Sequence, residues 1–211
     1  ISYMFESSQF NQDISGWDIS NVTNMSYMFA SSSFNQDISN WDVSNVGSMS
    51  SMFRGASSFN QDIGNWDVGN VANISKMFFE ASSFNQDIGN WDVGNVTNIS
   101  NMFTGASSFN QDIGNWDVSS VTEMSYMFRQ VSNFNQDIGN WDTSNVGSMV
   151  SMFYGATAFD QNLGGWNLSN VQSLENMLDG SGMSPENYGA TLVGWAGQPN
   201  VPSNISLGAA G

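Results

Sequence analysis

The sequence predicts a solenoid, a linear stack of short coils that share one core. The motif FNQDIGNWDV at 84–93 recurs along the chain, and its Phe is followed by the next after 24 residues once and after 25 thereafter. A unit of this length cannot bury its apolar edge alone, so it must stack on its neighbours. The Phe residues that mark the units are Phe10, Phe34, Phe59, Phe84, Phe109, Phe134 and Phe159.

Apolar residues inside each unit follow the spacing i, i+3, i+5 at Ile, Trp and Val. This is the spacing of the LxxLxL core of a leucine-rich repeat. Neither the sustained 3.6-residue period of a long helix nor the two strands per unit of a meander fits it. We therefore expect a leucine-rich-repeat-like solenoid with one short parallel β-strand around Trp-Asp-Val and one short helical or 3₁₀ turn per 25-residue coil.

The predicted solenoid covers residues 1–178, with a partial first coil, and residues 179–211 are expected to form a C-terminal helical cap. The opening ISYMF resembles the middle of a unit, so we expect the chain to be part of a longer polypeptide. A glycine stands two residues after Met-Phe in several coils, which suits a positive φ, but Glu80 and Gln130 stand there in others. Glycine is therefore expected to be preferred there rather than required.

Helix signals place the helix of the cap near 185–196. Ser184 is a favourable N-cap and Pro185 a favourable first helical residue. Tyr188, Leu192 and Trp195 would then share one helical face and pack on the last coil.

The amino-acid composition limits the kinds of partner and of catalytic site that the chain can have. The chain has three basic residues, Arg54, Lys76 and Arg129, against nineteen acidic ones, for a formal charge of −16. This balance argues against nucleic-acid binding, because phosphates are neutralised by basic patches. The absence of His and Cys excludes the usual catalytic triads, thiol nucleophiles and zinc sites. No apolar run is long enough to insert into a membrane.

Aspartates occupy two repeated positions, one before Ile and one after Trp, so each set becomes a row when the coils stack. The Asp before Ile is expected to accept a backbone N–H within the turn. Asn162 in the last coil keeps the oxygen that this bond needs. This first row contains Asp13, Asp37, Asp62, Asp87, Asp112 and Asp137.

The second row lies between Trp and Val, both expected to point inward, so strand alternation would turn its carboxylates outward. Solvation by water is one explanation of this acidic face. The other is a ligand, either Ca²⁺ held between Asp42, Asp67, Asp92 and Asp117 or a basic protein surface. The candidate ligand face comprises Asp18, Asp42, Asp67, Asp92, Asp117 and Asp142.

The remaining repeated residues are expected to be structural. Trp, Met and Phe should form the core, since a row of exposed indoles would promote aggregation. The Asn after the strand, for example Asn45 and Asn70, should bond backbone groups where the chain turns.

The repeated unit FNQDISNWDVSNVTNMSYMF, seen almost unbroken at 34–53 and 109–128, resembles the 25-residue repeat of BspA-like leucine-rich-repeat surface proteins of bacteria. The closing SPENYGATLVGWAGQ is similar to the segment after such arrays. The resemblance implies a secreted or surface-anchored protein, an attachment or protein-interaction role, further domains in the same polypeptide and no catalytic residues.

Three functions remain open from the sequence. The first is a non-enzymatic recognition or adhesion module that presents its acidic face to a protein or cell-surface ligand. The second is a spacer or stalk within a large surface protein. The third is a glycoside hydrolase that uses paired carboxylates, although an active site is normally one unique constellation rather than a repeated pair.

Overall fold

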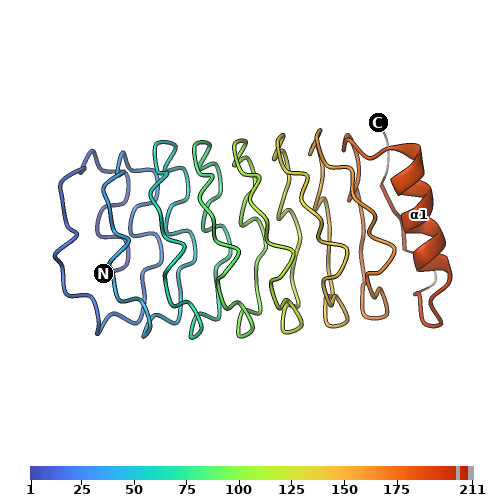
Figure 1. Ribbon diagram of the computed structural model, residues 1–211, viewed down its shortest axis with the longest axis horizontal. Coiled ribbons are helices and arrows are strands. Elements are labelled where there is room, and N and C mark those ends of the chain that lie inside the picture. Colours follow the sequence, from blue (N-terminus) through green and yellow to red (C-terminus); the bar gives the residue numbers. More distant parts are fainter. Residues whose placement is uncertain (203–204, 209–211) are drawn as a thin grey trace.

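The computed structural model describes residues 1–202 and 205–208, which form an elongated stack of coils with a helix across one end (Figure 1). The chain runs along the long axis of the stack, one coil after another, from the N-terminus at one end to the cap at the other. The helix, α1, spans Pro185–Ala196. Within the described ranges it is the one α-helix, and no β-strand is present.

The predicted leucine-rich-repeat-like fold class is therefore wrong. Neither the strand around Trp-Asp-Val nor the helical or 3₁₀ turn after it is formed, and parallel pairing is limited to isolated bridges. All but one of these bridges join one residue per coil to its equivalent in the next coil, beyond the Trp-Asp-Val segment. The bridges pair Asn24 with Ser48, Ser48 with Asn73, Asn73 with Asn98, Asn98 with Glu123, Glu123 with Ser148 and Ser148 with Ser173, and Leu174 with Leu207 at the cap.

The segment after each bridge, for example residues 25–31, shows why no strand forms. We call this segment of each coil the Met-Phe arm. The N–H groups of Tyr27 and Phe29 donate to carbonyl groups of the next coil, at 3.0 and 2.9 Å. The N–H groups of Met28 and Ala30 instead donate to carbonyls three residues back in their own coil. Every second donor thus closes a turn, so the backbone groups are paired without a sheet.

Two residues of each Met-Phe arm have positive φ, such as Tyr27 at 61° and Ser31 at 54°. The second position holds the expected glycines, but Glu80 and Gln130 keep the same conformation there, at 56° and 59°. A side chain in the left-handed region costs roughly 1–2 kcal/mol. The stack therefore imposes this conformation on every coil, whichever residue stands there.

The core is continuous along the stack and contains the predicted Trp, Met and Phe residues together with buried Ile and Val residues of the coils. The Phe rings of successive coils stack, as between Phe53 and Phe78 at a centroid distance of 5.8 Å. The repeat Trp side chains are buried apart from that of the first coil, Trp17, which is 37% exposed. The prediction that these residues form the core is confirmed.

Side chains join the coils where the backbone does not. In the described chain no backbone hydrogen bond links the Trp-Asp-Val segments of neighbouring coils. Instead the indole Nε1 of Trp66 donates to the carbonyl of Ile38 in the preceding coil at 3.1 Å. The amide of Asn70 donates to the carbonyl of Ser44 at 2.7 Å, as predicted for the Asn row.

The cap continues these contacts beyond the last coil. Ser184 accepts a bond from the N–H of Asn187 as the N-cap of α1. Trp195 donates its indole N–H to the carbonyl of Leu163 at 2.8 Å, the bond that a repeat Trp would make. Two residues of the predicted packing face are confirmed, since Trp195 is buried and Tyr188 packs against the core. The prediction that Leu192 also packs on the last coil is wrong, because its side chain is 37% exposed. Thr191 is buried in its place.

Asp160 fixes the start of the cap. It stands where earlier coils carry Asn and accepts the backbone N–H of Ser184 at 2.8 Å and the side-chain amide of Asn187 at 2.9 Å. These donors favour the charged carboxylate. The Ser184 backbone N–H, followed by the Asn187 amide, therefore holds the pKa of Asp160 below its usual value of 3.8.

Two glycines of α1 provide a matched pair for testing the docking of the cap. A Cβ on Gly194 would lie 2.5 Å from the Cα of Gly164, whereas one on Gly189 would meet nothing within 4 Å. We expect Gly194→Ala to destabilise the protein by roughly 1–3 kcal/mol through overpacking. Gly189→Ala should stabilise it by up to about 1 kcal/mol, because alanine favours the helix. Urea unfolding measures both, and an equal change in the two variants would contradict this docking.

Asp160 should make the cap sensitive to acid. Because its pKa is lowered in the folded state, its contribution is present above the usual value of 3.8 and is lost as the pH falls through the lower folded pKa. Asp160→Ala should cost about 1–2 kcal/mol at neutral pH, whereas Asp160→Asn keeps the accepting oxygen and removes the titration. Amide hydrogen exchange of α1 across the acid range measures the effect. Identical acid loosening in wild type and Asp160→Asn would contradict it.

Candidate functional site: two rows of aspartates

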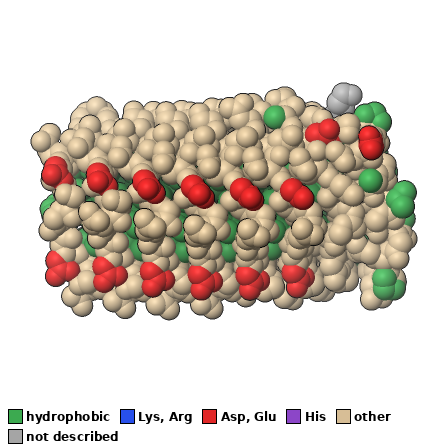
Figure 2. Space-filling view, in the orientation of Figure 1, with side chains coloured by type: hydrophobic (Ala, Val, Ile, Leu, Met, Phe, Trp, Pro, Cys, Tyr) green, Lys and Arg blue, Asp and Glu red, His purple; other side chains and the backbone are tan. Residues whose placement is uncertain are grey.

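Two parallel rows of acidic side chains run along one long face of the stack, with a strip of hydrophobic side chains between them (Figure 2). The stacking of the coils brings together the six aspartates of each predicted row. No Lys or Arg side chain is visible on this face. We call it the acidic face.

Each aspartate of the first row closes a turn, as predicted. The Oδ1 of Asp37 accepts the backbone N–H of Ser39, two residues on, at 2.9 Å. Asp62 accepts the N–H of Gly64 at the same distance. Asn162 keeps the bond in the last coil, to the N–H of Gly164. The prediction for the first row is confirmed.

The second row makes the same bond, which the strand model did not predict. Asp42 accepts the N–H of Ser44 at 3.1 Å and its hydroxyl at 2.6 Å. Asn167 replaces the aspartate in the last coil and accepts the N–H of Ser169 at 2.9 Å. These side chains are exposed, but a turn places them there rather than the alternation of a strand.

Hydrogen bonds from serine residues favour the ionised form of some aspartates in each row. The hydroxyl of Ser44, and then its backbone N–H, lowers the pKa of Asp42, while the charge of Asp18 in the neighbouring coil raises it. The backbone N–H of Ser39 similarly lowers the pKa of Asp37. Hydrogen bonds thus outweigh the repulsion along the row at these two positions. The pKa is lowered by the same kind of bonds at Asp13, Asp18 and Asp117.

The rows do not gather into a metal centre. Among the residues that the structure describes, no group of three or more His, Cys, Asp or Glu side chains could hold a metal ion. Asp42, Asp67, Asp92 and Asp117, the predicted Ca²⁺ ligands, follow one another along the second row, one in each coil. Ca²⁺ takes six to eight oxygen ligands, so these carboxylates would need many more donors to complete a site.

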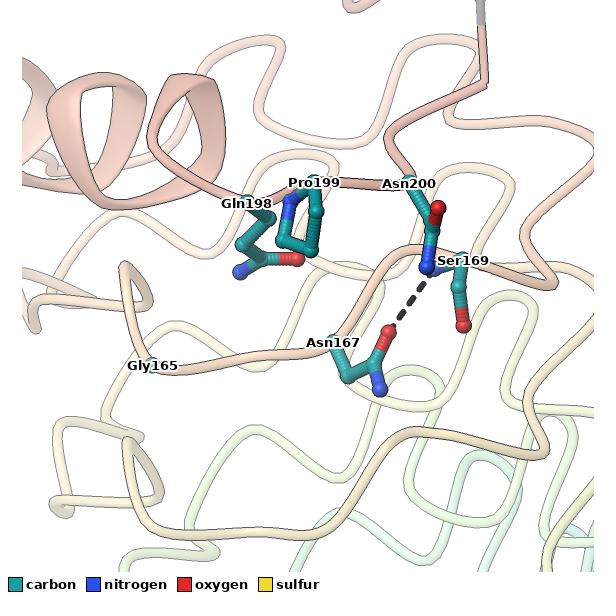
Figure 3. Close-up of a pocket in the computed structure, with 6 residues that line it drawn as sticks. All are labelled: Gly165, Asn167, Ser169, Gln198, Pro199 and Asn200. Atoms are coloured by element: carbon teal, nitrogen blue, oxygen red, sulfur yellow. Dashed lines mark hydrogen bonds between the residues drawn. The ribbon is translucent and has the colours of Figure 1, made fainter.

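Two cavities lie at the cap end of the stack. One of about 260 Å³ lies between the last coil and the segment after α1, lined by residues such as Asn167, Ser169 and Gln198 (Figure 3). Ser169 donates its backbone N–H to Asn167 within the wall that the last coil contributes. Its lining contains no acid or base, so it offers no pair of carboxylates for glycoside hydrolysis. An apolar cavity of about 230 Å³ lies beside Leu192 and Trp195.

Two further rows of residues lie on the Met-Phe arm, and the sequence analysis did not single them out. Their side chains change from coil to coil and stand at the third and sixth positions of the segment that reads MSYMFA at 25–30. We call them the variable columns. The first contains Tyr3, Tyr27, Ser51, Lys76, Asn101, Tyr126, Ser151 and Asn176, and the second Glu6, Ala30, Arg54, Phe79, Thr104, Arg129, Tyr154 and Asp179.

Asp92 provides a test of the structural role of the second row. Its Oδ1 accepts the N–H of Gly94 at 3.1 Å. Asp92→Asn should be at least as stable as wild type, because it keeps the acceptor and removes one repelling charge, as Asn167 does. Asp92→Ala should lose about 1 kcal/mol with the bond. Thermal unfolding at low and high salt measures both, and equal destabilisation by the two substitutions would rule out the turn bond as the reason for the row.

Comparisons with known proteins agree with the repeat. The family described as "Mycoplasma protein of unknown function, DUF285" matches residues 1–98 and again residues 83–189. No curated protein and no solved structure matches the chain. No helix in the described ranges has both the length and the apolar character to cross a membrane. Since the two matches together span most of its length, the chain belongs to the DUF285 family of repeat proteins.

Proposed function

We propose that the chain is a non-enzymatic recognition module of a bacterial cell-surface or secreted protein, and that its acidic face binds a basic protein or cell-surface ligand. The observation that carries this proposal is the acidic face itself, where two rows of carboxylates run in register without a visible cation between them. The resemblance to BspA-like surface proteins supports the extracellular setting and the adhesive role, independently of the strand that this chain lacks.

The acidic face is preorganised. Each carboxylate is held by its own turn, and each turn is held in the stack by bonds such as those from Trp66 to Ile38 and from Asn70 to Ser44. A rigid surface loses little conformational entropy when a ligand binds. The turn uses one or two acceptor sites of a carboxylate that has about four, so a partner's Arg or Lys still finds acceptors.

A basic protein surface fits this face better than Ca²⁺ does. Guanidinium and ammonium groups pair with single carboxylates, whereas Ca²⁺ needs several oxygens at one point. The carboxylates are distributed along the face, and no group of three acidic side chains that could hold a metal forms in the described part of the chain. Distributed charge also accelerates the encounter with a basic partner.

The absence of enzymatic activity is part of the proposal. The chain has no His or Cys, and its carboxylates recur in the same way in coil after coil. Catalysis normally depends on one constellation in one pocket. The elongated shape of the stack also favours a second role, as a spacer that holds another domain away from the cell surface (Figure 1).

A synthetic Arg- and Lys-rich peptide tests the acidic face. We expect it to bind the wild type and to bind the triple variant Asp67→Asn, Asp92→Asn, Asp117→Asn roughly tenfold more weakly, because each Asn keeps the turn and removes one charge of the row. Titration calorimetry at physiological salt measures the affinity.

The matched control for this experiment removes the same charge away from the rows. Glu6→Gln, Glu175→Gln and Glu186→Gln together change exposed residues and should leave the affinity close to that of wild type. An equal loss of affinity in both triple variants would show that only the net charge matters, and it would contradict the proposal.

Thermal unfolding with Ca²⁺, with Mg²⁺ and with chelator tests the metal alternative. A rise of the unfolding temperature that is specific to Ca²⁺ would make the second row a calcium site instead.

A further inference from the structure

The variable columns stand out because most other positions of the repeat are nearly constant. Their residues are often large, and several are exposed, such as Tyr3 at 56% and Tyr154 at 38%. The stack does not require these side chains, because the same positions hold Ser51 and Ala30 in other coils. The contrast with the aspartates is direct, since each Asp makes the same turn bond in its coil.

The two columns form one surface. Thr104 of the second column lies beside Asn101 of the first, with Oγ1 and Oδ1 3.5 Å apart. Its hydroxyl also donates to the carbonyl of Tyr126 in the next coil. Residues of neighbouring coils touch within each column, as Tyr3 and Tyr27 do with ring centroids 4.7 Å apart. The small members Ala30, Ser51, Thr104 and Ser151 are buried. A partner would therefore contact the larger exposed members, such as Arg54, Lys76 and Tyr154, which come from both columns and several coils.

All three basic residues of the chain belong to the variable columns. The guanidinium of Arg54 lies 5.5 Å from the ring centroid of Phe79, and that of Arg129 lies 5.3 Å from that of Tyr154. Such cation–π pairs hold each guanidinium against an aromatic ring. Arg and Tyr are also the residue types that contribute most to binding at protein interfaces.

We propose that the variable columns form a second recognition surface, distinct from the acidic face, for a protein partner that presents carboxylates. The two acids of the columns, Glu6 and Asp179, stand in the first and last coils, and the charged side chains between them are Arg54, Lys76 and Arg129. These three cations supply the charge complementarity. The change of side chain from coil to coil fits an aperiodic partner, because a repeating polymer or a crystal lattice would be matched by constant residues at a constant spacing. A protein surface is aperiodic in this way.

A displayed random-peptide library panned against the intact protein tests this inference. We expect the selected peptides to be acidic, and their affinity to fall by on the order of tenfold or more in the variant Arg54→Ala, Arg129→Ala, Tyr154→Ala. Alanine already occupies this column at position 30, so the fold should be kept, and thermal unfolding verifies that it is. The matched control, Asp67→Asn, Asp92→Asn, Asp117→Asn, changes the acidic face alone and should leave the affinity of these peptides intact.

Three results would overturn the inference. Selected peptides that are basic and depend on Asp67, Asp92 and Asp117 would leave the acidic face as the recognition surface and support the proposed function instead. Equal enrichment on wild type and on the Arg-Tyr variant would show that the variable columns bind nothing. Binding of plain polyglutamate as tight as that of the selected peptides would show that charge alone, rather than the sequence of side chains, attracts the ligand.

Discussion

The backbone bonds between neighbouring Met-Phe arms are the constraint on which the rest of the structure depends. Tyr27 and Phe29 each donate to the next coil, and the equivalent residues repeat this along the stack. These bonds fix the register at one coil per repeat, so a residue type that recurs in the sequence becomes a row in space. The Phe stack, the Trp bonds and the two rows of aspartates all follow from that register.

The stacking could be anticipated from the sequence, but the local backbone could not. Ile, Trp and Val at i, i+3 and i+5 would suit a strand, and the same spacing also suits two successive turns that point these side chains inward. The signal that favours turns is the small residue two positions after each Asp, for example Ser44 after Asp42, which a side-chain-to-backbone bond uses. Positive φ at Glu80 and Gln130 was hidden as well, because a stack can impose it on residues that do not prefer it.

The candidate site was predictable to a similar degree. The two acidic rows followed from the repeat alone, since any register of one coil per unit aligns them. The turn role of the second row was indicated by Asn167, which keeps the acceptor and loses the charge, as Asn162 does in the first row. The variable columns could not be predicted in the same way, because their residues differ from coil to coil and form no repeated motif. In a repeat, invariance marks what the scaffold needs, and variation at exposed positions marks where the scaffold leaves a choice.

The cap shows how the same bonds end the stack. Within the stack, the backbone N–H of Asp160 and the side-chain amide of Gln161 donate to Asn135 of the preceding coil. At the cap, the backbone N–H of Ser184 and the side-chain amide of Asn187 donate to Asp160 in the same way. Trp195 bonds Leu163 as a repeat Trp would bond the preceding Ile, although it comes from a helix. The edge of the last coil is thus satisfied by donors that imitate a further coil, while α1 itself offers no equivalent edge to continue the stack. A change of local structure, with the contacts preserved, is what converts a repeat into a terminus.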